Sequence, residues 1–327
     1  MKTGFVFGKF LPLHSGHLAL IEFGSRHCDI LHIILCHTAS EPIEGAIRKK
    51  WLDSTFNGFP NIHVIAFEYD EQELPNSSES SEKISKLWSA AFKKMLPDAD
   101  IVFTSEKYGD YVASFMGIEH LMYDNHRLKA PISGTDIRNE PFLHWHMIAP
   151  AARSYFVRKI VLIGTESTGK STLTKRLANY FQTTMVPEMA RDIIEKTEEV
   201  TYQELAQIAT LHASAINDKL PDANKLLFVD TDIKTTQSYS LFLFGKELQV
   251  EKWIQEINSF DLYLFLLPDC EFVQDGTRLP ANERLKLDIH HKNYYLAHGA
   301  DLNYVNGNWE ERFEQAIRII KKKFSMI

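Results

Sequence analysis

The sequence predicts an α/β protein of two domains, each built on a parallel β-sheet. Its 327 residues are enough for two separate hydrophobic cores. Short apolar runs alternate with amphipathic stretches of helical length, which is the pattern of parallel α/β folds. Two loops of phosphate-binding type, at 8–17 and 164–171, each follow an apolar strand. We expect the domains to comprise residues 1–152 and 153–327.

In the first half, strands are expected where apolar residues run without a break, and helices where they recur every three or four residues. The segment from Asp70 to Glu82 is acidic and rich in Ser, so we expect an exposed loop there, either a lid over a site or a solvated excursion. The expected strands cover 4–8, 30–36, 62–67, 100–104 and 118–123, and the expected helices 16–27, 44–56, 82–96 and 108–116.

The second half begins after a short join at 148–153 and follows the same plan. Its first strand, Phe156 to Ile163, runs directly into the second phosphate loop. Further strands are expected over 183–186, 225–230, 261–267 and 302–305, and helices over 169–181, 187–197, 201–219, 233–244, 247–257, 281–295 and 309–324.

Composition and charge exclude several classes of protein. Hydrophobic residues make up 44% and charged residues 24%, which is ordinary for a folded globular protein. A net charge of -7 argues against a nucleic-acid surface, which usually needs a basic patch. Three cysteines without CxxC spacing predict free thiols in a reducing compartment. No apolar run approaches the roughly 20 residues that span a bilayer, so we expect a cytoplasmic protein without membrane insertion; a homo-oligomer stays open.

The first loop carries two imidazoles at the expected start of a helix. Free N–H groups and the positive end of the helix dipole lie there, so these imidazoles can bind the phosphates of ATP and stabilise charge that builds on them. Two histidines at a helix start are also common as capping or surface residues, and the motif alone leaves both interpretations open. The residues of this motif are Gly8, Lys9, Phe10, His14, Gly16 and His17.

A second segment favours the phosphate interpretation. Ser133 and Asp136 form a capping box, which predicts a helix whose first N–H groups point outward. Arg138, one turn into that helix, has a guanidinium that can bind phosphate oxygens in fork geometry. A plain capped helix with a solvated arginine is the alternative.

Together these residues resemble the G(K/R)F, HxGH and ISGxxIR motifs of class I nucleotidyltransferases, most closely those of nicotinamide mononucleotide adenylyltransferases. The resemblance implies a Rossmann-like domain in which a substrate 5′-phosphate attacks the α-phosphorus of ATP in line, with Mg²⁺ and loss of pyrophosphate. It implies that His14 and His17 carry the transition-state charge, and that Lys9 and Arg138 bind the β- and γ-phosphates. The third motif comprises Ile132, Ser133, Gly134, Thr135, Asp136, Ile137 and Arg138.

The second loop is a complete P-loop in the strand-to-helix context that this motif requires. Lys170 is expected to reach the β- and γ-phosphates, and Ser171 to ligate Mg²⁺. Asp230 and Asp232 end an apolar strand of Walker B form; one carboxylate can organise Mg²⁺ and the other can accept a proton, or the strand end is only a helix cap. The remaining nucleotide-binding candidates are Gly164, Glu166, Ser167, Thr168, Gly169 and Thr172.

Further clusters favour a kinase over a GTPase. Glu188 and Arg191 follow the second strand of this half, where a small acceptor would lie near the phosphates. Arg278, in the segment Asp275-Gly276-Thr277-Arg278, and Arg284 suit a lid whose Arg meets the migrating phosphoryl group, although a solvated loop is the alternative.

Aromatic side chains can stack on a flat base, but a core position is commoner for them. The aromatic candidates in the first half are Trp51, Trp88 and Tyr108.

With these clusters, nearly the whole chain resembles the bifunctional nicotinamide mononucleotide adenylyltransferase/ribosylnicotinamide kinases, the NAD biosynthesis regulator family. The resemblance implies that Asp230 or Asp232 and Glu188 surround the acceptor ribose and its 5′-hydroxyl, and that Tyr202 borders the nicotinamide. Enterobacterial members begin with a helix-turn-helix domain. Because our first strand starts within a few residues of Met1, we do not expect DNA binding.

The resulting expectation is a two-step enzyme of NAD salvage. The P-loop kinase domain would phosphorylate nicotinamide riboside with ATP and Mg²⁺, and the HxGH nucleotidyltransferase domain would adenylylate nicotinamide mononucleotide to NAD. A kinase product that carries a 5′-phosphate is the nucleophile that an HxGH domain uses. A riboflavin kinase/flavin adenylyltransferase-type pair and a nucleotide-sensing regulatory ATPase stay open as alternatives.

Overall fold

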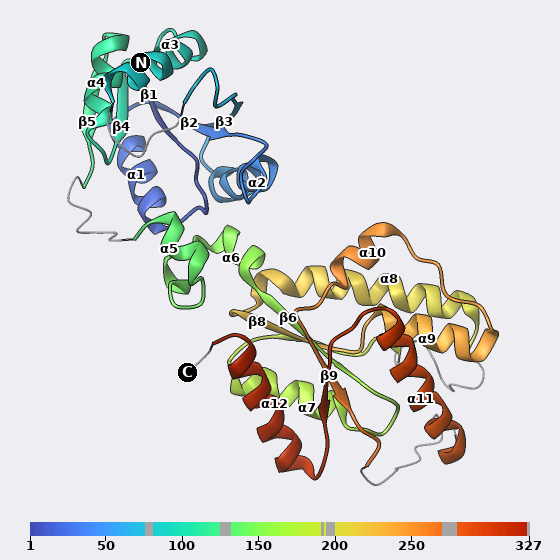
Figure 1. Ribbon diagram of the computed structural model, residues 1–327. Helices are drawn as coiled ribbons and strands as arrows, with labels where there is room; N and C mark the ends of the chain where they lie inside the picture. The colour runs from blue at the N-terminus through green and yellow to red at the C-terminus, as the bar shows by residue number, and fades with distance from the viewer. Residues whose placement is uncertain (76–80, 125–131, 191–192, 194–199, 270–279, 326–327) are drawn as a thin grey trace. The chain divides into compact units, whose positions relative to one another are not determined.

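The computed structural model describes residues 1–75, 81–124, 132–190, 193, 200–269 and 280–325. The chain divides into two compact units, Met1–Phe156 (unit 1) and Val157–Ile327 (unit 2); Figure 1 labels their helices and strands. Each unit contains a five-stranded sheet whose strands are all parallel. The fold class predicted from the sequence is confirmed. No helix among the described residues is long and apolar enough to cross a membrane.

The sheet of unit 1 has the order β3-β2-β1-β4-β5. The chain moves outward from β1 to β3 and then returns to β4 on the other side of β1. Such a switch point opens a crevice at the carboxyl ends of the strands, and β1 ends there at Gly8. The elements are β1 (Thr3–Gly8), α1 (Ser15–Ser25), β2 (Ile30–His37), α2 (Gly45–Phe56), β3 (Ile62–Glu68), α3 (Glu82–Met95), β4 (Ile101–Thr104), α4 (Tyr108–Met116), β5 (Glu119–Met122), α5 (Gly134–Asn139) and α6 (Pro150–Phe156).

The sheet of unit 2 has the order β10-β9-β6-β8-β7, with β6 in the centre. All five residues of β8 are buried, as expected for a parallel strand covered on both faces. The loop after β6 therefore lies between the carboxyl ends of β8 and β9. The elements are β6 (Arg158–Ile163), α7 (Lys170–Tyr180), β7 (Met185–Val186), α8 (Tyr202–Lys219), β8 (Leu226–Asp230), α9 (Ile233–Phe244), α10 (Lys252–Ile257), β9 (Leu262–Leu266), α11 (Ala281–Ala297), β10 (Leu302–Val305) and α12 (Trp309–Lys323).

The segment expected to join the two halves belongs instead to unit 1. Residues 150–156 form α6, so β6 begins at Arg158 rather than at Phe156. The ring of Tyr155 in α6 packs edge-on against Trp51 of α2, with centroids 5.7 Å apart. This contact between distant parts of the chain stabilises a helix in a segment that was expected to be mainly a short join.

Two helix predictions in unit 2 are also wrong in part. The helix expected from residue 247 begins at Lys252, because the preceding loop is held by tertiary contacts: Leu248 is fully buried, and its backbone oxygen accepts a hydrogen bond from Gln237 Nε2 at 3.1 Å. Of the helix expected over 187–197, residues 187–189 are not helical. Residues 191, 192 and 194–197 of that prediction lie outside the described residues.

Candidate functional site

The loop between β1 and α1 holds the two predicted imidazoles against each other. His14 caps α1, and its Nδ1 accepts a hydrogen bond from the backbone N–H of Gly16 at 3.1 Å. The His17 ring stacks on His14 with centroids 3.8 Å apart, and Phe10 meets His17 edge-on. Burial of the ring, together with the neighbouring His14, lowers the pKa of His17 well below 6.5. His17 is therefore a neutral imidazole at physiological pH.

Helix α5 is docked on this same loop. The predicted capping box is present: Ser133 Oγ accepts from the N–H of Asp136 at 3.2 Å, and Asp136 Oδ2 accepts from the N–H of Ser133 at 3.1 Å. Arg138 donates a hydrogen bond to the backbone oxygen of Leu11. At Gly134, a Cβ would lie 2.3 Å from that same oxygen, so the close approach requires glycine. The structure thus brings the HxGH and ISGxxIR segments together.

Glu41 and Arg48 also belong to this site, although neither is part of a sequence motif. Glu41 Oε1 lies 2.9 Å from Lys9 Nζ, and Oε2 pairs with Arg48, which is fully buried. Arg48 Nη1 also donates to the backbone oxygen of Lys9 at 2.6 Å. Burial by itself would raise the pKa of Glu41, but the hydrogen bonds from Lys9 and Arg48 lower it below 4.5. The sequence of α2 does contain an indication of this pair. Arg48 shares a helix face with the apolar Leu52, and a charge that is buried on such a face needs a partner.

We expect Glu41→Gln to remove part of the acid sensitivity of unit 1. Because the pKa of Glu41 is lower in the folded protein than in the unfolded chain, its ionised form stabilises the fold above about pH 4.5. This contribution is lost as the pH falls through the lower folded-state pKa. Urea unfolding should show that wild type exceeds the variant by about 1–3 kcal/mol at neutral pH, and that the gap closes at acid pH. A gap that stays constant would contradict this role.

The P-loop connects β6 to α7 in unit 2. Gly164 has a φ of +139°, and a Cβ there would lie 2.6 Å from the backbone oxygen of Leu266. Thr168 Oγ1 and Lys170 Nζ both donate to the backbone oxygen of Thr165, at 2.8 and 3.0 Å. Lys170 is only 8% exposed. The loop thus encloses its own cation, as the phosphate-binding motif requires.

The two carboxylates at the end of β8 have different surroundings. Asp230 is fully buried and pairs in register with Leu162 of β6, close to the start of the P-loop. Asp232 caps α9: its Oδ1 accepts from the N–H of Thr235 at 2.9 Å and from the hydroxyl of Tyr295. Burial raises the pKa of Asp232, despite these hydrogen bonds. Asp232 thus caps α9, and the roles of Asp230 and Asp232 in catalysis and Mg²⁺ binding stay predictions.

Side chains from α8 and α9 approach the same edge of the sheet. Tyr239 donates to Glu166 Oε1 of the P-loop at 3.2 Å, and burial and the carboxylates of Glu166 and Glu188 raise the pKa of Tyr239. His212 lies near Glu188 and forms a hydrogen bond with the backbone of Asp230; burial lowers its pKa to about 4. Neither His212 nor Tyr239 is part of a sequence motif. For His212 the available signal was its place on the apolar, buried face of α8.

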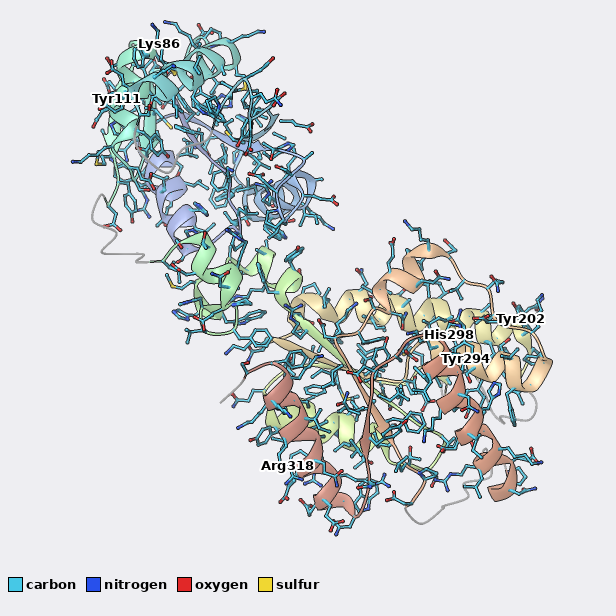
Figure 2. All side chains as sticks on the ribbon, in the orientation of Figure 1. Lys86, Tyr111, Tyr202, Tyr294, His298 and Arg318 are labelled. Atoms are coloured by element: carbon cyan, nitrogen blue, oxygen red, sulfur yellow. The ribbon has the colours of Figure 1, made fainter. Side chains whose placement is uncertain are left out.

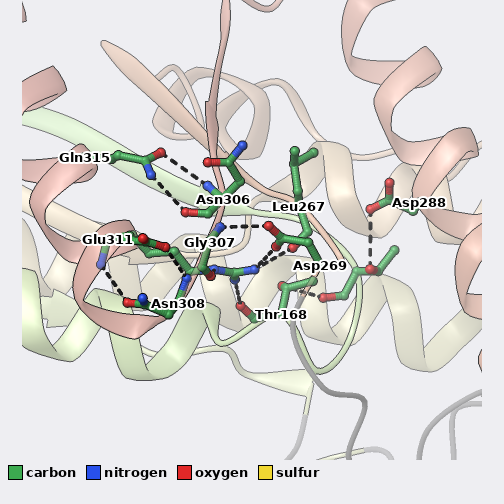
Figure 3. A network of polar contacts seen from close by, with 11 residues as sticks. Thr168, Leu267, Asp269, Asp288, Asn306, Gly307, Asn308, Glu311 and Gln315 are labelled. Carbon is green, nitrogen blue, oxygen red and sulfur yellow. Dashed lines mark hydrogen bonds and ion pairs between the residues drawn. The ribbon is translucent and has the colours of Figure 1, made fainter.

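A buried arginine ties the P-loop to the ends of β9 and β10, and Figure 3 labels its partners Thr168, Leu267, Asp269 and Gly307. Arg312, in the first turn of α12, is 1% exposed. It donates to the backbone oxygens of Thr168 at 2.6 Å, Leu267 at 2.9 Å and Gly307 at 2.8 Å, and it pairs with Asp269. One guanidinium thus satisfies carbonyl groups from three loops and holds the P-loop in place.

We expect Arg312→Ala to lower the free energy of unfolding by about 2–4 kcal/mol, because it leaves buried carbonyl groups without donors. Arg312→Lys keeps the charge but loses the planar fork, so it should recover only part of this stability. Arg318 is exposed on the same helix (Figure 2) and provides the matched control. Arg318→Ala should change the stability by less than about 0.5 kcal/mol in the same urea titration. Equal effects of the two alanine variants would contradict the role of Arg312.

Tyr202, predicted near the nicotinamide, belongs to a polar cluster around Glu247. Its hydroxyl donates to the backbone oxygen of Glu247 at 3.3 Å. Tyr294 donates to the Glu247 carboxylate, and His298 Nε2 lies 4.0 Å from it (Figure 2 labels all three partners). The substrate role of Tyr202 stays a prediction.

The other aromatic candidates lie in or against the core of unit 1. Trp51 is 5% exposed. Trp88 and Tyr108 are partly buried and pack against the core, with Trp88 among the rings of other aromatic residues. Base stacking by Trp88 stays a prediction. Arg191 and Arg278 lie outside the described residues.

Known proteins resemble both the whole chain and its separate parts. Residues 159–312 match the family described as AAA domain. The trifunctional NAD biosynthesis/regulator protein NadR of Escherichia coli (strain K12) is 33% identical over 298 residues, which cover 84% of this chain and 71% of that protein. The nicotinamide-nucleotide adenylyltransferase of Thermococcus kodakarensis is 25% identical over 170 residues, 49% of this chain and 84% of that protein. The crystal structure of a NadR protein in complex with NR has a TM-score of 0.82 at 22% identity, covering 99% of this chain and 96% of that one.

Proposed function

This chain belongs to the family of the NAD biosynthesis/regulator protein NadR, and we propose that it catalyses both steps from nicotinamide riboside to NAD. ATP first phosphorylates the riboside to nicotinamide mononucleotide, and adenylyl transfer from a second ATP then gives NAD and pyrophosphate. One observation carries the proposal: each unit has a phosphate-binding loop at the carboxyl edge of its own parallel sheet, and the two loops are of different chemical types.

In unit 1, a 5′-phosphate oxygen of nicotinamide mononucleotide attacks the α-phosphorus of ATP, and the bond to pyrophosphate breaks as the new P–O bond forms. The stacked His14 and His17 donate hydrogen bonds to oxygens on which charge builds. Burial keeps His17 neutral before ATP binds, and the negative phosphates favour its protonated form, in which both ring nitrogens are donors. The ion pair with Glu41 holds Lys9 beside this loop, where its ammonium group meets the β- and γ-phosphates.

In unit 2, the P-loop and Lys170 hold the triphosphate of ATP, and the 5′-hydroxyl of nicotinamide riboside attacks the γ-phosphorus. Ser171 and Asp230 would hold Mg²⁺, because they offer the hard oxygen ligands that this ion prefers. When bound, Mg²⁺ neutralises charge on the phosphate oxygens. Glu188 follows β7 and Asp230 ends β8, at the same edge of the sheet as the P-loop. In this proposal a carboxylate of the pair accepts the proton of the attacking hydroxyl.

The test is mass spectrometry of the products formed from ATP, Mg²⁺ and nicotinamide riboside, with riboflavin as the competing acceptor. We expect nicotinamide mononucleotide to appear first, followed by NAD and pyrophosphate, and we expect no riboflavin phosphate. Phosphorylation of riboflavin in preference to the riboside would contradict the proposed substrate. Hydrolysis of ATP without phosphorylation of either acceptor would point to a regulatory ATPase.

A further inference from the structure

One polar side chain interrupts the apolar face of α8. His212 is 5% exposed, and the other buried residues of this helix are aliphatic. Its Nε2 atom is buried and has no hydrogen-bond partner in the part of the chain that the structure describes. Because an unpaired buried nitrogen is costly, such an atom points to a ligand or a water that completes it.

The other contacts of the ring define what Nε2 can bind. The hydrogen bond to the backbone of Asp230 favours the protonated ring, so the imidazole is the donor and the carbonyl oxygen is the acceptor. Since Nε2 has no partner, Nδ1 makes this bond. A neutral imidazole has one donor and one acceptor nitrogen. Nε2 therefore carries a lone pair and requires a donor such as a hydroxyl group.

His212 lies close to the two carboxylates that the proposed function places around the acceptor. Asp230 ends β8, and Glu188 follows the neighbouring strand β7, so both lie at the carboxyl edge of the sheet beside the P-loop. His212 contacts the backbone of Asp230 and lies near the carboxylate of Glu188. The imidazole of His212 and the nearby carboxylate of Glu188 offer two acceptors, which suits the neighbouring hydroxyl groups of a ribose.

We propose that His212 Nε2 accepts a hydrogen bond from a ribose hydroxyl of the nucleoside that unit 2 phosphorylates, and thereby determines specificity for ribosides. This inference rests on the proposed function, because it assumes that a nucleoside is the acceptor. A buried water on Nε2 is the structural alternative, and it would give His212 no part in choosing the acceptor.

The test compares kcat/KM for nicotinamide riboside with that for its 2′-deoxy and 3′-deoxy analogues, in wild type and in His212→Phe. In wild type, we expect one analogue to lose about tenfold to a hundredfold, because it leaves Nε2 unpaired. His212→Phe should lose a similar factor on the riboside and show little further loss on that analogue, while the KM for ATP stays unchanged. His212→Gln keeps an acceptor oxygen and should fall between the two; it carries the test if His212→Phe does not fold.

Ile216→Ala is the matched control, because Ile216 is fully buried one turn further along α8. It should weaken the packing of the helix yet leave the ratio between riboside and deoxy analogues at its wild-type value. The inference would be overturned if the two changes acted independently. In that case kcat/KM of His212→Phe on either deoxy analogue would fall by the product of the two separate factors. A wild type that phosphorylates no nicotinamide riboside would instead overturn the proposed function, and this inference with it.

Discussion

Lys170→Ala is expected to lower kcat/KM for phosphorylation of nicotinamide riboside by about a hundredfold to a thousandfold, while adenylylation of supplied nicotinamide mononucleotide continues at the wild-type rate. Lys170 is buried in the P-loop, and its Nζ already donates to the backbone oxygen of Thr165. The ammonium group is therefore preorganised for the triphosphate. Alanine removes the charge that stabilises the migrating phosphoryl group.

The matched control is Lys175→Ala, because Lys175 is exposed on the same helix α7 and lies beyond the P-loop. It should leave both activities within about twofold of wild type. Both reactions are measured on the same preparation, so adenylyl transfer also reports whether Lys170→Ala is folded. Equal loss of both activities in Lys170→Ala would show that the two sites depend on each other.

His17→Ala should produce the opposite pattern. We expect nicotinamide mononucleotide to accumulate from the riboside, and NAD formation to fall by about a hundredfold or more. The ring of His17 packs against His14 on one side and against Phe10 on another. This packing fixes the orientation of the ring and therefore of its N–H groups. His14→Ala should reduce the rate more mildly.

The control for the second experiment is His27→Ala, since His27 is exposed just beyond the end of α1. This variant should make NAD at the wild-type rate. The time course of nicotinamide mononucleotide and NAD, followed by mass spectrometry, distinguishes the outcomes. If His17→Ala forms NAD as fast as wild type, the assignment of adenylyl transfer to the HxGH loop is wrong.

Features set by local chemistry could be predicted from the sequence. A P-loop needs glycine at a positive φ and a helix directly after it, and Gly164 to Lys170 meet both needs within seven residues. The capping box of α5 likewise depends on Ser133 and Asp136 alone. The apolar runs of the parallel strands are also local signals, because both faces of such strands are buried.

Features that depend on a distant partner could not be predicted in this way. Helix α6 forms where a short join was expected, and Tyr155 of this helix packs on Trp51. Nothing near Arg312 in the sequence indicates that its guanidinium reaches Thr168, which lies 144 residues away. The apolar pattern of α8 marks His212 as unusual, but only the fold brings it to the backbone of Asp230.

The sequence by itself determined the two α/β units and the two phosphate loops, because their backbone conformations follow from residues that are adjacent in the chain. Only the tertiary structure decided how those loops are held: Glu41 and Arg48 beside Lys9, and Arg312 behind the P-loop. The physical reason lies in burial. A charged or polar group can be buried only when the fold supplies its partner, and the identity of that partner depends on long-range packing that no short segment encodes.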